Sequence, residues 1–333
     1  MLPDFLYNDF LGTPIWFWTS FLGIVMGLLV FDLGILNKKD HEIEVKESLK
    51  LSAFYITVGL LFGGWVWMER GSELGMLYYT GFVVEKTLAL DNIFVIAMIF
   101  SFMGIPRLYQ HRVLFWGILG VILLRGIMIG LGAALVKEYH EVLYIFAAFL
   151  IVTGIKMLIP SKEEEEEGDF SNNPILKFFK KYFRTTDKIH GHDFFTKLKD
   201  PKTGKLVTYV TPLFIALIMI EFADVIFAVD SVPAIFALTT DTFIIYTSNV
   251  FAILGLRALY FALAAMMARF AYLKYALAVL LIFIGSKIFI ADFLMAGAKF
   301  PPLLSLGITF VILAIGMFYS LWKTRDTGTE QKS

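Results

Sequence analysis

Acidic side chains, an amide and a hydroxyl recur in the middle of long apolar stretches of this sequence, where polar residues are rare. Seven of them form the predicted metal site: Glu85, Asp91, Asn92, Glu221, Asp224, Asp230 and Ser231. Oxygen ligands of these types suit Mn²⁺, Mg²⁺ or Ca²⁺, whereas Zn²⁺ and Cu⁺ sites normally use His, Cys or Met. Apart from His140, the first residue of one stretch, the apolar stretches contain neither His nor Cys. These residues therefore predict a site for a hard divalent cation, without deciding among the three ions.

The spacing of the second group limits how it can bind one ion. Glu221 and Asp224 are three residues apart and share a helix face, whereas Asp224 and Asp230 are six apart and diverge by about 120° on a regular helix. Pro233 lacks an N–H and clashes with the preceding turn, so it favours a break that exposes carbonyl groups. We expect the seven side chains to flank a cavity near the middle of the membrane.

Further charged residues in the apolar stretches are predicted to serve as gates or ion-pair partners. They are Asp32, Lys86, Arg125, Lys156, Arg257 and Lys287. With the five acids of the site they make eleven charged groups, which would cost on the order of 30 kcal/mol if exposed to lipid. They must therefore face protein, water or an ion.

These residues are expected to have different roles. Arg125 and Arg257 lie near mid-stretch and are expected in permanent ion pairs that hold the acids in place. Lys156 and Lys287 either snorkel to the membrane surface or pair with carboxylates. Lys86 could act as a tethered cation for the site when no metal is bound. Asp32 is either a gate ligand or a residue at a helix end.

The elements that position these residues are nine predicted membrane-spanning helices. The chain has 333 residues, of which 58% are hydrophobic and only 17% charged, against roughly 25% charged in a soluble domain. Each stretch supplies about twenty residues, enough to cross ~30 Å of hydrocarbon. The nine stretches are residues 13–36, 49–68, 74–102, 112–136, 140–159, 209–238, 242–266, 272–292 and 302–322. The predicted fold class is an all-α, multi-pass membrane protein.

The basic residues between the helices predict the orientation. Loops on one side of the predicted membrane carry three Lys and Arg residues, and loops on the other side carry twenty-one. Because cytoplasmic loops are enriched in these residues, the N-terminus is expected outside and the C-terminus in the cytoplasm. Asp4 and Asp9 precede the first stretch where a signal peptide has basic residues, so we expect that stretch to be retained. The predicted location is the inner (plasma) membrane.

An internal duplication relates two groups of three helices. The matching segments are residues 85–93 with 224–232, 124–126 with 256–258, and 150–159 with 281–290. A unit of three helices is odd, so the second unit must lie upside down relative to the first. Inverted repeats with polar midplane residues are typical of secondary transporters, whose substrate binds at the repeat interface.

The repeats divide the chain into five segments. These are residues 1–73 with two helices, repeat 1 at 74–159, a cytoplasmic loop at 160–208, repeat 2 at 209–292, and residues 293–333 with the last helix and tail. The loop contains an acidic run at 163–167, a basic amphipathic helix predicted on the inner membrane face at 174–184, and a hairpin turn at 200–205. The role of the loop is left open.

Two segments of the sequence resemble the signatures of the TerC family of bacterial integral membrane proteins. They are Glu-Lys-Thr-Leu-Ala-Leu-Asp-Asn-Ile-Phe at 85–94 and the segment 221–236, and the resemblance runs from about residue 15 to 322. It implies a transporter fold with inverted repeats, a link to tellurium resistance, Mn²⁺ efflux in several members and, in plants, a link to thylakoid biogenesis. It places functional roles on the seven residues of the predicted metal site.

Export of a divalent cation, with Mn²⁺ the first candidate, is therefore the leading functional hypothesis, with proton antiport as its expected coupling. Direct transport of tellurite fits less well, because an oxyanion needs more bases than acids. One alternative is a scaffold for membrane-protein assembly, or metal or tellurite resistance without direct transport. A remote alternative is an intramembrane aspartyl protease using Asp91 and Asp230, although the Gly-x-Gly-Asp context of such proteases is absent. We expect no enzymatic activity. We also expect no nucleic-acid partner, because the net charge is zero and the chain has no overall positive field to attract one. The lipid bilayer is the expected surrounding, and oligomers or membrane-protein partners are left open.

Overall fold

A computed structural model describes seven parts of the chain. They are residues 3–32, 43–139, 141–159, 174–199, 205–264, 272–294 and 300–324. Within them, the side chains at positions 90, 91, 94, 174, 175, 180, 229, 230, 257, 294 and 302 are not described. The predictions for the side chains of Asp91, Asp230 and Arg257, for the acidic run and for residues 200–204 of the hairpin turn therefore lie outside the described residues.

Helices occupy all nine of the predicted ranges. They are α1 (Ile15–Phe31), α2 (Val45–Arg70), α3 (Ser72–Phe102), α4 (Arg107–Glu138), α5 (Val142–Leu158), α7 (Pro212–Phe236), α8 (Thr242–Ala264), α9 (Leu273–Phe289) and α10 (Pro302–Lys323). A π-helical turn, η6 (Ile290–Leu294), extends α9, and a 3₁₀ turn, η1 (Asp4–Tyr7), precedes α1. The chain is thus mostly helical, as predicted.

Five of these helices are long and apolar enough to cross a membrane: α2, α4, α7, α10, and α9 with its extension. A sixth is α8 if its two segments, which meet at a bend of 51°, count as one span. Each of α1 and α5 has 17 residues. In α3, every window of 18 residues holds three charged residues, because Glu85, Lys86 and Asp91 lie in its middle. The structure therefore supports a multi-pass membrane protein, while nine crossings remain a prediction.

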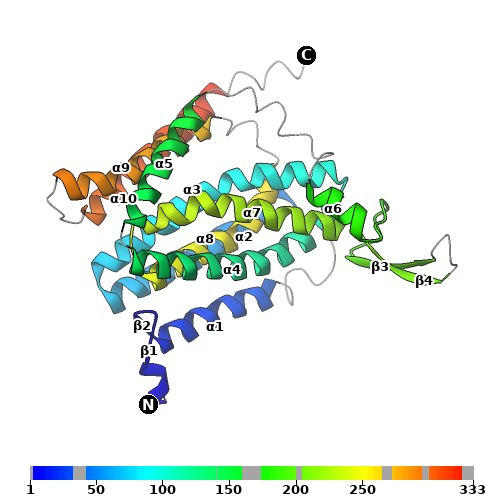
Figure 1. Cartoon of the computed structure of the whole chain (residues 1–333), viewed down its shortest axis with the longest axis horizontal. Helices are drawn as coiled ribbons and strands as arrows, with labels where there is room; N and C mark the ends of the chain where they lie inside the picture. Colours follow the sequence, from blue (N-terminus) through cyan, green and yellow to red (C-terminus); the bar gives the residue numbers. More distant parts are fainter. Residues whose placement is uncertain are drawn as a thin grey trace.

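The helices of the two predicted repeats pack around each other. Helix α3 contacts α8 and α7, and α4 contacts α7 and α8, so these four helices form the centre of the molecule (Figure 1). Helix α2 packs on α3 and α8, while α5, α9 and α10 form a second group at one edge (Figure 1). Glu85 of α3, Arg125 of α4 and Asp224 of α7 are buried between these helices.

Two glycines make a reciprocal close contact between α5 and α9. A Cβ atom on Gly154 would lie 2.6 Å from the carbonyl oxygen of Ala278, and one on Gly285 would lie 2.5 Å from that of Ala147. Gly154 and Gly285 are 131 positions apart, and so are Ala147 and Ala278. Only glycine allows the two backbones to approach this closely. The same contact is thus made twice, once in each direction.

Two antiparallel hairpins and one short helix complete the described structure. Strands β1 (Asp9–Phe10) and β2 (Thr13–Pro14) pair before α1, and β3 (Phe195–Lys199) pairs with β4 (Leu206–Val210), as the predicted hairpin turn requires. Helix α6 (Pro174–Tyr182) lies within the predicted amphipathic segment. Its Leu176 and Phe179 are buried against the helical core, whereas Phe178 and Tyr182 remain exposed. One side of α6 therefore packs on protein.

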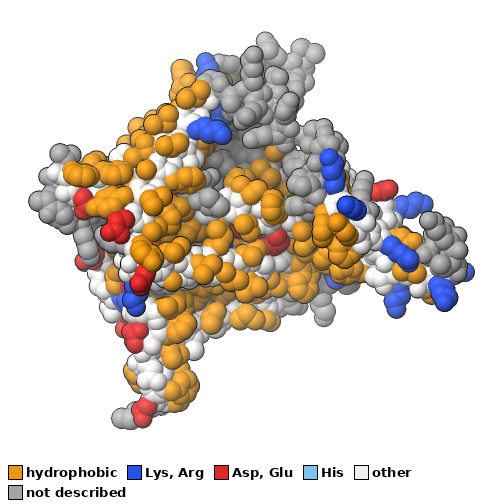
Figure 2. Space-filling model, viewed as in Figure 1, with side chains coloured by type: hydrophobic (Ala, Val, Ile, Leu, Met, Phe, Trp, Pro, Cys, Tyr) orange, Lys and Arg blue, Asp and Glu red, His pale blue; other side chains and the backbone are white. Residues whose placement is uncertain are grey.

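The outer surface is strongly apolar along the helices. Leu61, Met68 and Phe318 are 70%, 78% and 75% exposed, which favours lipid over water as their surroundings. Lys and Arg side chains gather at the end that carries α6 and the β3–β4 hairpin (Figure 2). This is the end predicted to face the cytoplasm.

Candidate functional site

Arg125, in the middle of α4, is the centre of a buried polar network. Its side chain is 1% exposed. Nη1 donates to Glu85 Oε1 of α3 at 2.5 Å and to Ser231 Oγ of α7 at 2.8 Å. Nε and Nη2 lie 3.5 Å from the two carboxylate oxygens of Asp224, also on α7. One guanidinium group therefore joins three helices.

The two carboxylates that Arg125 contacts are equivalent residues in the predicted duplication. Glu85 matches Asp224 in the alignment of residues 85–93 with 224–232. Both are buried, with side chains 1% and 11% exposed, so each needs a charged partner at this depth. Arg125 supplies that partner for both, in the ion pairs that its position in the sequence predicts.

Two amides extend the network. Asn92 Nδ2 donates to Asp224 Oδ1 at 3.3 Å, and Asn249 Oδ1 of α8 accepts from Arg125 at 3.3 Å. Asn249 is fully buried, and its Nδ2 makes no hydrogen bond with the described residues. Asn249 is a member of the network that the sequence did not predict. A signal was present, because Ser248 and Asn249 interrupt an apolar stretch.

Glu221 differs from the other acids of the site. Both of its carboxylate oxygens are buried and have no hydrogen-bond partner in the described part of the chain. The carboxyl group lies against α4 at Gly120, where any Cβ atom would collide with it. Glu221 is one helical turn before Asp224 on the same face of α7. It is therefore a buried acid with unused oxygens beside the Arg125 network.

A small cavity reaches the network. Its volume is about 40 Å³, and its polar lining includes Asn92, Asp224 and Tyr260. A space of this size holds about one water molecule or a single ion.

The described side chains do not by themselves form a metal cage. No group of three or more His, Cys, Asp or Glu residues lies close enough to hold an ion, within the residues that the structure describes. Two of the acids, Glu85 and Asp224, are already paired with Arg125. Asp91 and Asp230 adjoin Asn92 and Ser231 in sequence, but their side chains lie outside the described residues. Glu85, Asn92, Asp224 and Ser231 are brought together, and Glu221 adjoins them.

The remaining predicted gate and ion-pair residues take different environments. Lys86 Nζ donates to the carbonyl oxygen of Ala252 at 2.8 Å. Asp32 is buried at the end of α1, and Lys156 is exposed on α5. None of these three residues belongs to the Arg125 network.

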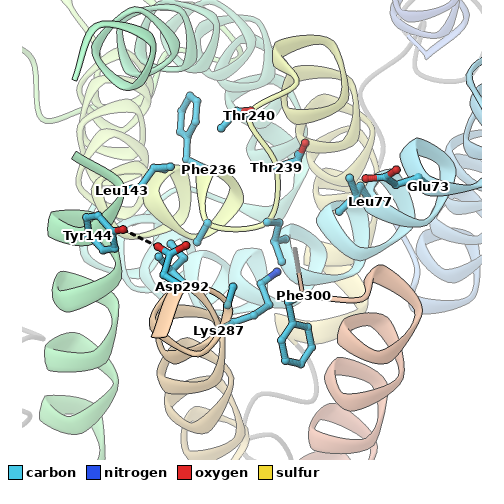
Figure 3. A pocket seen from close by; sticks show the side chains of 14 residues that line it. Glu73, Leu77, Leu143, Tyr144, Phe236, Thr239, Thr240, Lys287, Asp292 and Phe300 are labelled. Atoms are coloured by element: carbon cyan, nitrogen blue, oxygen red, sulfur yellow. Dashed lines mark hydrogen bonds between the residues drawn. The ribbon is translucent and has the colours of Figure 1, made fainter. Parts of the chain in front are cut away.

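Lys287 points into a second cavity, at the opposite end of the central helices from α6. Its volume is about 280 Å³, and the lining includes Tyr144, Thr240 and Asp292 (Figure 3). Lys287 is 6% exposed and forms no ion pair with the described residues. Asp292 accepts a hydrogen bond from the Tyr144 hydroxyl at 2.6 Å (Figure 3).

Comparison with known proteins gives the family. The model of the integral membrane protein TerC family matches residues 70–328. An uncharacterized membrane protein of Rickettsia bellii is 47% identical, over 91% of this chain and 96% of its own length.

Two further relatives extend across nearly the whole chain. An uncharacterized membrane protein of Myxococcus xanthus is 42% identical over 94% of each chain. A Salmonella typhi protein named "Putative membrane-bound redox modulator Alx" is 42% identical, over 93% of this chain and 95% of its own. No solved structure matches the chain. The matched range includes the whole Arg125 network, and the chain belongs to the TerC family of integral membrane proteins.

Proposed function

We propose that this protein is a secondary transporter that exports a divalent cation, with Mn²⁺ the first candidate, through a site between α3, α4 and α7. The observation that carries the proposal is Glu221. A carboxylate with two buried oxygens and no described partner is costly in a low-dielectric interior unless a cation or proton joins it. Because the side chains of the site offer oxygen ligands, we expect that cation to be a hard one.

The charge balance of the network supports a divalent ion. Arg125 is one positive group among three acids, Glu85, Asp224 and Glu221. The net charge of these four groups is −2 when all are ionised, which one divalent cation would neutralise. We name Mn²⁺ as the first candidate, ahead of Ca²⁺ and Mg²⁺, because the sequence resembles a family with several Mn²⁺ efflux proteins. An oxyanion such as tellurite would meet an excess of acids here.

The arrangement of the helices supports alternating access. The reciprocal contacts of Gly154 and Gly285, and the bridge that Arg125 makes between the matched acids, are what a pseudo-two-fold axis through inverted repeats would produce. In this proposal the N-terminus lies outside, the C-terminus lies in the cytoplasm, and nine helices cross the inner membrane. Exchange of protons for metal on the carboxylates would supply the coupling.

Flux into proteoliposomes tests the proposal. The purified chain should carry Mn²⁺, and Ca²⁺ and Mg²⁺ are measured in parallel. Glu221→Gln and the pair Asp91→Asn with Asp230→Asn should each reduce flux at least tenfold. Glu69→Gln, at an exposed acid of α2, should leave it unchanged. Undiminished flux in the site variants would contradict the site, and Mn²⁺ flux without counter-movement of protons would contradict the coupling.

Two other functions predict different results. A scaffold for membrane-protein assembly needs no cation, so metal-dependent thermal stabilisation that is lost in Glu221→Gln would separate it from a transporter. The name of the Salmonella typhi relative refers to redox modulation. This chain has no cysteine, so thiol–disulfide exchange by its own side chains is not available to it. An aspartyl protease would need Asp91 and Asp230, and would cleave peptides in the same preparation.

A further inference from the structure

The bend of α8 has an identifiable cause. The segments Thr242–Leu256 and Ala258–Ala264 meet at 51°. The Ser48 hydroxyl, from α2, donates to the carbonyl oxygen of Ala258 and accepts from the N–H of Ala262 at 3.0 Å. In a regular helix these two backbone groups would bond to each other. A side chain has therefore entered the hydrogen-bond ladder, which is a known origin of helix bends.

Tyr260 lies on the bent segment and points toward α4. It is 4% exposed. Its hydroxyl donates to Gln110 Oε1 at 3.1 Å. Gln110 Nε2 in turn donates to the carbonyl oxygen of Ile105 at 2.9 Å. Phe100 of α3 packs edge-on against the Tyr260 ring, with centroids 5.7 Å apart. The short segment of α8 is thus fixed to α3 and α4 through one side chain.

Tyr260 also separates two cavities. On one side is the cavity of about 40 Å³ that reaches Asn92 and Asp224. On the other is a cavity of about 580 Å³ lined by Glu44, Arg107 and Gln110. Tyr260 lines both. Arg107 and Glu44 lie at the helix ends predicted to face the cytoplasm, so the larger cavity is the entrance on that side.

We propose that Tyr260 and Gln110 form the cytoplasmic gate of the cation site, and that the α8 segment Ala258–Ala264 moves at the Ser48 bend to open it. When their hydrogen bond is made, the path from the entrance to Asn92 and Asp224 is closed. When it breaks, the two cavities join. The cargo in this inference rests on the proposed function, whereas the gate itself is a statement about access and is tested without transport.

Thiol accessibility measures the gate directly, because the chain has no cysteine of its own. Ile96 lines the smaller cavity and is 9% exposed. Ile96→Cys in inside-out vesicles is treated with a charged, membrane-impermeant thiol reagent. Adding Tyr260→Phe or Gln110→Leu should raise the modification rate about fivefold, the factor that corresponds to the loss of one hydrogen bond. Two variants on different helices guard against a folding defect in either.

A second tyrosine of α8 supplies the matched control. The Tyr246 hydroxyl donates to the carbonyl oxygen of Ile122 at 3.1 Å, and neither residue lines either of the two cavities. Tyr246→Phe removes a similar hydrogen bond and should leave the rate at Ile96→Cys unchanged. Equal rates with and without Tyr260→Phe and Gln110→Leu would overturn the gate, as would an equal increase in Tyr246→Phe. If the unmodified chain carries no Mn²⁺ but the gate variants still change accessibility, the cargo is refuted and the gate is retained.

Discussion

Replacing Arg125 with methionine tests whether the buried network is held together by charge. Methionine keeps most of the length and apolar volume of the side chain and removes the guanidinium group. Glu85 and Asp224 would then be buried with no positive partner among the residues that contact them now. The helices α3, α4 and α7 should no longer be held at their present spacing.

The expected loss can be worked from the contacts. Removing one partner of a buried ion pair costs about 3–5 kcal/mol, because the remaining charge is left uncompensated. Here one residue serves two carboxylates, whose side chains are 1% and 11% exposed, so we expect Arg125→Met to lie at the upper end, about 5 kcal/mol. The free energy of unfolding is measured by titrating SDS into detergent micelles and following helix content.

Two comparisons identify the origin of the loss. Arg70 pairs with Asp241 at 3.0 Å, but the two side chains are 16% and 20% exposed, so Arg70→Met should cost only about 1 kcal/mol. Adding Glu85→Gln and Asp224→Asn to Arg125→Met removes both carboxylates that paired with Arg125 and should recover at least half of the loss. If Arg125→Met costs no more than Arg70→Met, or if the triple variant is no more stable than the single one, the charge argument is wrong.

Three further predictions use the same unfolding measurement. Gly154→Ala and Gly285→Ala should each cost about 1–3 kcal/mol by forcing α5 and α9 apart, whereas Gly27→Ala, with no atom within 4 Å of the new Cβ, should cost nothing. Lys86→Met should change stability by less than about 1 kcal/mol, because Lys86 has no ion pair with the described residues; a loss above about 3 kcal/mol would reveal an acidic partner. Glu221→Gln should not lower stability, since no described donor is lost, but it should abolish stabilisation by added Mn²⁺; a stable variant that still responds to the ion would exclude Glu221 as a ligand.

The helices were predictable because their signal is local. Lipid-length apolar stretches bounded by charged loops require helices, and the structure has a helix in each predicted range. The amphipathic pattern likewise predicted α6. The pattern could not show that Leu176 and Phe179 pack against the protein core. An apolar helix face has the same sequence pattern whether lipid or protein covers it.

The candidate site was predictable in its members and less so in its bonding. The rarity of charges in apolar stretches selected Glu85, Arg125 and Asp224, and their mutual contact follows from the cost of burying each alone. Asn249 carries no charge, so a search for charged residues in apolar stretches does not find it. The insertion of Ser48 into α8 depends on the packing of α2, which no periodicity in either segment indicates.

The asymmetry between the repeats explains why Glu221 is the residue to test first. Glu85 and Asp224 are matched positions, and Arg125 uses both to join the two halves. Glu221 lies three positions before Asp224, and the equivalent position before Glu85 is Phe82, a buried aromatic residue. Gly120 leaves room on α4 for the Glu221 carboxyl group. An acid that stabilises only the fold would be expected to have a partner, and Glu221 has none among the described residues. In the proposed transporter, the matched acids therefore hold the predicted repeats together, and the additional acid of the second repeat is the one left free for the cation.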